Sequence, residues 1–132
     1  MKNAFFQRAQ RKAVDVATRK HRLLNLVAQL FRKMQGMNWK EEGLQSAKSR
    51  LSVFGRLSKA YALGQYRNIP WKTLLIIVAA ILYFVNPFDL LPDLIPIAGF
   101  TDDFGVLLWA YSAVNKEIDK FLAWEQSQIS AS

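Results

Sequence analysis

The segment NPFDLLPDLIPIAGFTDD, residues 86–103, decides the fold of this 132-residue chain, because it interrupts a sequence that otherwise follows helical periodicity. It places three prolines and four aspartates between two apolar segments. Each proline removes a backbone hydrogen-bond donor, and the residue before a proline avoids helical backbone angles. A helix that enters this segment therefore ends by Asn86. The segment predicts a broken turn between two helices.

Apolar helices are predicted on both sides of this turn. Residues 71–85 form the first, since an asparagine and a proline just before them suit a helix start. From residue 74 onward the only polar side-chain group in this helix is the hydroxyl of Tyr83, so no face of it suits water. Thr101 can cap the second helix. Its apolar positions recur at helical spacing, and they are Phe104, Leu107, Leu108, Tyr111, Val114, Ile118, Phe121 and Leu122.

Two basic amphipathic helices are predicted before the apolar pair, one from about Ala4 to Met34 and one from about Leu44 to Tyr61. No strand pattern competes with these four helices. We therefore expect an all-α protein, a small four-helix chain with an apolar helical hairpin broken by the Pro/Asp-rich turn. The expected organisation is a basic helical region at 1–68, a hairpin domain at 69–125 and a disordered tail at 126–132.

Charge is divided sharply along the chain. Residues 1–72 contain 16 Lys or Arg and 3 Asp or Glu, a net charge of +13. Residues 73–132 contain 2 Lys or Arg and 7 Asp or Glu, a net charge of −5. A basic half joined to an apolar half predicts that the first meets an anionic surface and the second something nonpolar. The chain has no cysteine, which excludes disulfides, thiol nucleophiles and cysteine-ligated zinc. The single histidine, His21, lies among cations and is expected on the surface.

The central segment also resembles a known family. Its prolines, aspartates and glycine match the spacing of the YkvA family (domain of unknown function 1232), and the matching residues are Pro87, Asp89, Pro92, Asp93, Pro96, Gly99, Asp102 and Asp103. The resemblance covers roughly residues 70–115 and names a fold module without naming a reaction. It implies membrane association, because members of this family look membrane-associated.

The apolar hairpin could lie in a membrane or in a protein core. Residues 69–85 would extend about 25 Å as a helix, which is less than the hydrocarbon thickness of about 30 Å. The positions of the charged residues favour the membrane alternative. A hairpin that crosses the bilayer twice would place its flanking cations on one side, as the positive-inside rule expects. These cations are Arg67, Lys72, Lys116 and Lys120. We therefore expect a protein of an inner membrane or an endomembrane, with its basic N-terminal region cytoplasmic. A soluble helical bundle is the alternative.

The four aspartates are the candidate metal ligands. Asp89, Asp93, Asp102 and Asp103 could form an oxygen-rich cluster suited to Ca²⁺ or Mg²⁺. The simpler interpretation, which we favour, places Asp102 and Asp103 in the first turn of a helix and lets Asp89 and Asp93 cap turns. Gly99 would then supply a backbone conformation that a side chain forbids. No cofactor is expected on this interpretation, and the divalent cation stays an open alternative.

No catalytic residue can be identified, so we expect a structural or interactive role rather than an enzyme. The runner-up is a soluble bundle whose carboxylate turn binds a divalent cation and supports hydrolysis. For the basic half we expect anionic lipid as the partner. Nucleic acid is disfavoured, because the chain has no helix-turn-helix, zinc-finger or RNA-recognition signature. The sequence does not identify a protein partner.

Overall fold

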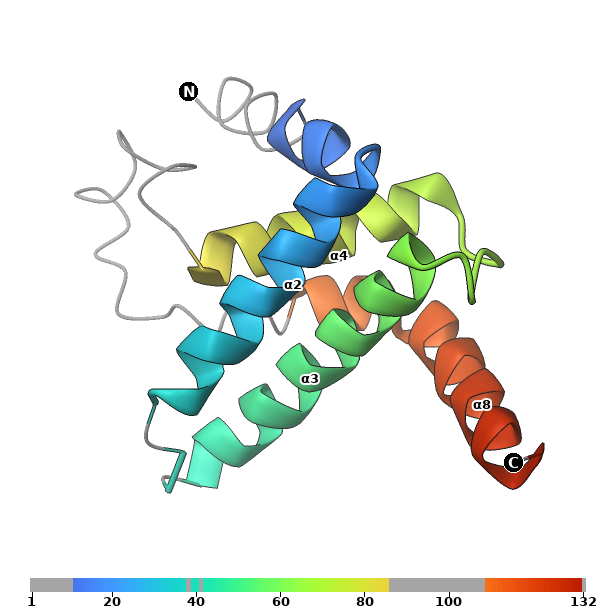
Figure 1. Ribbon diagram of the computed structural model, residues 1–132. Helices are drawn as coiled ribbons and strands as arrows, with labels where there is room; N and C mark the ends of the chain where they lie inside the picture. Colours follow the sequence, from blue (N-terminus) through green and yellow to red (C-terminus); the bar gives the residue numbers. More distant parts are fainter. Residues whose placement is uncertain (1–10, 38, 41, 86–108, 132) are drawn as a thin grey trace.

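The computed structural model describes residues 11–37, 39–40, 42–85 and 109–131. Regular structure in these ranges is helical throughout, which confirms the all-α fold class (Figure 1). Residues 11–17 and 109–113 are helical, and the longer helices are α2 (Lys20–Gln35), α3 (Glu42–Ala62), α4 (Trp71–Val85) and α8 (Asn115–Ala131). The turn of the predicted hairpin lies outside the described residues.

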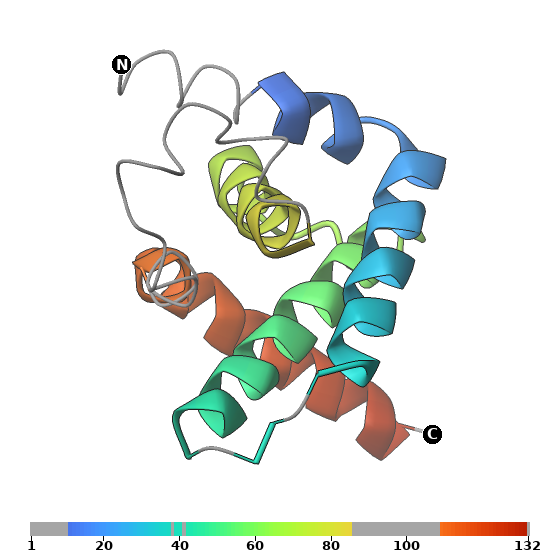
Figure 2. The ribbon, with the colours of Figure 1, turned by 90° about the vertical axis from the view of Figure 1, so that its left-hand side faces the viewer.

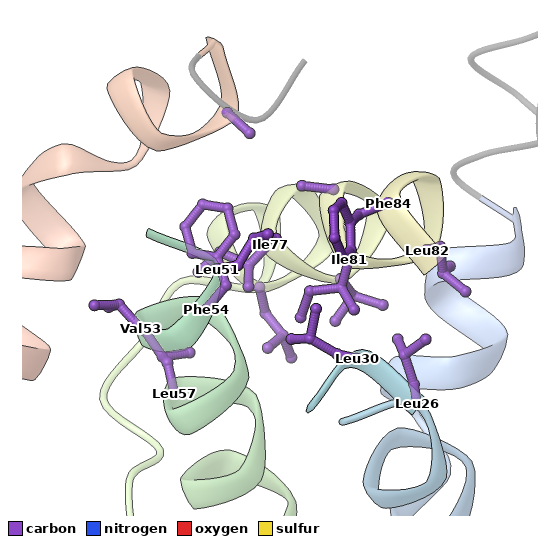
Figure 3. Packing of buried hydrophobic residues seen from close by; sticks show 14 of the residues in the cluster. Leu26, Leu30, Leu51, Val53, Phe54, Leu57, Ile77, Ile81, Leu82 and Phe84 are labelled. Carbon is purple, nitrogen blue, oxygen red and sulfur yellow. The ribbon is translucent and has the colours of Figure 1, made fainter. Parts of the chain in front are cut away.

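Helices α2, α3 and α4 pack against one another around one hydrophobic core. Figure 2 looks nearly along α4 and shows helical segments on several sides of it. In the close view of Figure 3, Leu30 of α2, Phe54 of α3 and Ile81 of α4 converge, and all three side chains are fully buried. Burying one such side chain stabilises a fold by about 2 kcal/mol relative to leaving it in water.

Helix α4 has the bounds that the sequence predicts, residues 71–85. Its first internal hydrogen bond joins the amide of Leu74 to the carbonyl oxygen of Pro70 at 3.1 Å, so the proline stands directly before the helix. A helix that is apolar on all sides needs cover on all sides. Accordingly, α4 buries Leu74, Ile77, Val78, Ala80, Ile81, Leu82, Tyr83 and Phe84. No helix in the described part of the chain combines the length and the apolarity that a membrane crossing requires.

The prediction of one continuous helix from Ala4 to Met34 is wrong at residues 18–19, where the chain leaves the helix before α2 begins. The hydroxyl of Thr18 donates to the carbonyl oxygens of Val14 at 2.7 Å and of Asp15 at 3.2 Å. Arg19 is extended, with φ −120° and ψ 111°. A threonine hydroxyl bonded to the preceding turn competes with helix continuation, and this break turns α2 away from residues 11–17.

The C-terminal helix also differs from the prediction. It bends at Val114, whose amide is shared between the carbonyl oxygens of Ala110 at 3.1 Å and Tyr111 at 3.2 Å, a pattern typical of a local 3₁₀ turn. Helix α8 then continues to Ala131, where we expected a frayed tail over 126–132.

Helix α3 ends at a glycine that turns the chain back toward α4. Gly64 has φ +77°, a left-handed conformation that other residues adopt only with strain. The amides of Gln65 and Tyr66 both donate to the carbonyl oxygen of Ala60, at 2.9 and 3.2 Å. This closed C-terminal turn brings residues 65–70 to the same end of the molecule as the start of α2.

Candidate functional site

The eight motif residues predicted from the sequence all lie within 86–108, outside the described residues. They are Pro87, Asp89, Pro92, Asp93, Pro96, Gly99, Asp102 and Asp103. Both interpretations of the aspartates, as turn caps and as metal ligands, therefore stay predictions. Within the ranges that the structure does describe, no three His, Asp or Glu side chains are grouped to hold a metal ion.

A lysine contacts the C-terminal end of α4, directly before the segment that contains the motif. Lys33 Nζ of α2 donates a hydrogen bond of 2.7 Å to the carbonyl oxygen of Phe84 and lies 4.9 Å from the centre of its ring. The last carbonyls of a helix carry partial negative charge, so an ammonium group is favourable there. Helical periodicity did not predict this contact, because 51 positions separate Lys33 from Phe84.

Contacts with α3 also fix the helical residues that follow the motif. Tyr111 stacks on Phe54 with 5.8 Å between the ring centres, and the guanidinium of Arg50 lies 5.2 Å from the centre of the Tyr111 ring. Farther along, Arg56 of α3 forms a two-pronged ion pair with Glu125 of α8, at 2.8 and 3.0 Å. The basic helices thus hold both flanks of the motif.

Aromatic residues join the α3–α4 connection to α8. The ring of Tyr66 lies 5.2 Å from that of Phe121 in an edge-to-face arrangement and 5.1 Å from that of Trp124. Burial raises the pKa of the Tyr66 hydroxyl, and the negative charge of Glu117 raises it further. We assign this cluster a packing role, because its rings cover one another and stack within the fold.

The basic half exposes many cations, and only some of them have a carboxylate partner. Asp15 pairs with Arg19 and Arg22, and Glu117 with Lys120. Six further cations of the basic half have no ion pair, side-chain hydrogen bond or ring contact with any described residue, and they are Arg11, Lys20, Arg32, Lys48, Lys59 and Lys72. All six side chains are exposed.

One pocket brings several of these features together. It has a volume of about 310 Å³ and is lined by residues from the start of α2, the end of α3 and the start of α4. Its lining includes two cations and two aromatic residues and no carboxylate, and consists of Ala17, Thr18, Lys20, Leu23, Tyr61, Ala62, Arg67 and Trp71. This is a cationic–aromatic pocket, and we use that name below.

A second pocket of similar volume lies between residues 11–17, α2 and the end of α4. Its cations are Lys12 and Arg22, and Arg22 is already paired with Asp15. The cationic–aromatic pocket is therefore the stronger candidate for an anion. Sequence reasoning placed Arg67 beside the third helix but did not connect it with Lys20, because 47 positions separate the two and only the fold brings them together.

A family model matches the region that contains the sequence motif. The family described as "Protein of unknown function (DUF1232)" matches residues 73–109, which fall inside the region 69–125. The chain is also similar to the "Uncharacterized membrane protein YkvA" of Bacillus subtilis (strain 168), with 36% identity over 74 residues, which cover 56% of this chain and 70% of the relative. No solved structure matches the chain. The motif, the segment that the family model matches and the similarity to YkvA together show that this chain belongs to the DUF1232 family, which is also called the YkvA family.

Proposed function

We propose that this protein is a membrane-associated helical protein with a structural or interactive role, and that its basic surface meets anionic lipid. The observation that carries the proposal is the set of six exposed cations in the basic half that have no ion pair, side-chain hydrogen bond or ring contact in the described residues. They come from residues 11–17 and from α2, α3 and α4, so the excess positive charge is spread over the basic half. Such a charge excess is stabilised by an anionic surface.

Lipid is the partner that this surface suits best. Each Lys or Arg near an anionic bilayer contributes about 1 kcal/mol of attraction at physiological salt, so several together give firm but salt-sensitive binding. The Bacillus subtilis relative is named a membrane protein, which supports the same choice. The proposal in full places the protein at an inner membrane or an endomembrane, with the basic helices on the cytoplasmic side, where anionic lipid creates a negative surface potential.

Two half-exposed apolar side chains add to this argument. Trp71 at the start of α4 is 43% exposed, and Leu63 just after α3 is 40% exposed. Both lie in the part of the chain that also carries Lys59, Arg67 and Lys72. Apolar and aromatic groups beside cations are typical of surfaces that enter the headgroup region of a bilayer.

Vesicle sedimentation tests the proposal directly. The full-length protein is mixed with vesicles of phosphatidylcholine alone, or with added phosphatidylglycerol, at low and at high salt. We expect sedimentation with the anionic vesicles at low salt and release at high salt, because salt screens the headgroup attraction. Equal binding to both kinds of vesicle, or binding to neither, would contradict the proposal. Duplex DNA of arbitrary sequence serves as the competing polyanion.

The manner of attachment is tested in cells that express the full chain. The membrane pellet is washed with high salt, then with alkaline carbonate, and then with detergent. Retention until detergent means that the apolar hairpin is inserted in the bilayer. Release by salt means that the basic surface alone holds the protein there. Absence from the pellet at physiological salt would count against membrane association altogether.

A further inference from the structure

The cationic–aromatic pocket carries a sharper inference than the overall charge does. Lys20 and Arg67 line it from two different elements, and no carboxylate among the described residues lines it with them. Neither Lys20 nor Arg67 has a carboxylate partner among the described residues. Two cations that share one pocket repel each other unless an anion lies between them. The pocket therefore has a charge that a bound anion would neutralise.

The helix ends around the pocket increase this positive charge. The first residues of α2 and of α4 both contribute to its lining, and neither helix has an acidic residue in its first turn. No side chain caps the start of α2, where Arg19 stands in the cap position. Instead, Lys20 and Lys72 occupy the first turns, where the helix dipole disfavours a cation. An anion in the pocket would relieve this repulsion and accept hydrogen bonds from uncapped amides.

Arg67 is held in place before any ligand arrives. Its guanidinium lies 4.3 Å from the centre of the Tyr61 ring, a cation–π contact that orients the side chain. A guanidinium is planar and presents paired donors, which match two oxygens of one phosphate group. Lys20 adds a point charge on the opposite element. The pocket thus offers one fork of donors and one ammonium group, which suits the oxygens of a phosphate group better than a chloride ion.

The position and size of the pocket identify the source of the phosphate. At about 310 Å³ it lies at the lower end of ligand pockets, which run from about 300 to 1,000 Å³, so it admits a small polar group. Its rim carries the half-exposed Trp71, and Leu63 is exposed in the connection that leads to it. Apolar groups at the rim would contact acyl chains while the pocket holds a headgroup.

We infer that this pocket binds the phosphate of an anionic lipid headgroup, between Arg67 and Lys20, with Trp71 at the lipid boundary. The inference rests on the proposed membrane association, and it adds a specific binding site to the diffuse attraction between the basic surface and anionic lipid. A specific site makes affinity depend on which cations are present and on their chemistry. A diffuse attraction depends only on how many cations there are.

The test compares two full-length double variants with the same loss of charge. Lys20→Gln with Arg67→Gln empties the pocket of cations, whereas Arg32→Gln with Lys48→Gln removes two exposed cations elsewhere. We expect the control variant to lose at most about thirtyfold in affinity for phosphatidylglycerol vesicles, which is the share of two diffuse cations, and the pocket variant to lose at least about tenfold more than the control. Arg67→Lys keeps the charge but loses the fork, and we expect it to lose about threefold or more. Circular dichroism melts of all variants show whether each one is folded.

The outcomes separate the site from the proposed function. Equal losses in the two double variants, with Arg67→Lys unchanged, would overturn the site while leaving lipid association intact. Failure of the unaltered protein to bind anionic vesicles would overturn the proposed function itself. Titration with inorganic phosphate and with glycerol phosphate distinguishes the sources. Tight binding of either in solution, abolished by the pocket variant, with no pocket dependence on vesicles, would overturn the lipid headgroup as the ligand.

Discussion

Gly55 of α3 lies close against Leu30 and Phe31 of α2, and replacing it with alanine tests the packing of the two basic helices. A Cβ at this position would lie 2.7 Å from Cζ and 3.0 Å from Cε2 of Phe31, and 3.0 Å from Cδ2 of Leu30. Carbon atoms pack best at about 3.5 to 4.0 Å. The phenyl ring is half-buried and can shift a little, but Leu30 is fully buried and has little room to retreat.

Two effects of opposite sign set the magnitude of this change. Alanine in a helix interior is more favourable than glycine by about 1 kcal/mol. Inserting a methyl group into a close-packed contact costs about 1 to 3 kcal/mol. Because all three distances are at or below 3.0 Å, we expect the packing cost to prevail. Gly55→Ala should lower the free energy of unfolding by about 1 kcal/mol, or the melting temperature by about 4 °C.

Urea and thermal unfolding, followed by circular dichroism, measure this difference. The control is the same substitution in a Phe31→Ala background, where the ring that supplies two of the three contacts is absent. There the helix preference should prevail, and Gly55→Ala should be neutral or stabilising. If Gly55→Ala instead stabilises the unaltered protein, the close approach of α2 and α3 at this point is not as described. If its effect is the same in both backgrounds, Phe31 is not the obstacle.

Three further changes test other parts of the fold. Ser58 is fully buried in α3 and its hydroxyl has no hydrogen-bond partner among the described residues, so Ser58→Ala should raise the free energy of unfolding by up to about 1 kcal/mol in urea titrations. A loss of more than about 1 kcal/mol would instead reveal a partner for that hydroxyl. Glu125→Gln breaks the ion pair with Arg56, whose side chain is 40% exposed, so it should cost at most about 1 kcal/mol, and less at high salt. The raised pKa of Tyr66 favours its neutral form in the folded state, so its contribution is fully present below the unfolded pKa and is lost as pH rises through the higher folded value. Tyr66→Phe should therefore lose less stability than the unaltered protein on titration into the alkaline range, and identical profiles would show that the hydroxyl is not buried.

Local signals predicted the third helix to the residue. Pro70 stands before its first turn and Asn86-Pro87 follows its last residue, so its bounds at Trp71 and Val85 needed no knowledge of the rest of the fold. Its core role was left open, because apolar length alone does not distinguish a short membrane segment from a buried helix. The packing of α4 on α2 and α3 is a tertiary fact that periodicity does not contain.

The features that sequence reasoning missed depend on contacts between distant positions. Thr18 ends the first helix through its own hydroxyl, with no glycine or proline to give a warning. Glu125 of the C-terminal helix pairs with Arg56, 69 positions earlier, a contact that periodicity does not predict. The cationic–aromatic pocket likewise needs three elements to meet. For the aspartate motif, sequence is still the only guide, so its two interpretations are separated by calorimetry with Mg²⁺ or Ca²⁺ on the full chain.

The core shared by α2, α3 and α4 extends beyond the residues that the family model matches. The matched residues 73–109 contain nearly all of α4 but none of the leucines of α2 or the phenylalanine of α3 that cover it. A peptide of the matched residues alone would expose the apolar surface of α4 to water, so it would aggregate or bind another apolar surface. In this chain, therefore, the segment that defines the family depends on two helices outside it to keep its apolar helix away from water.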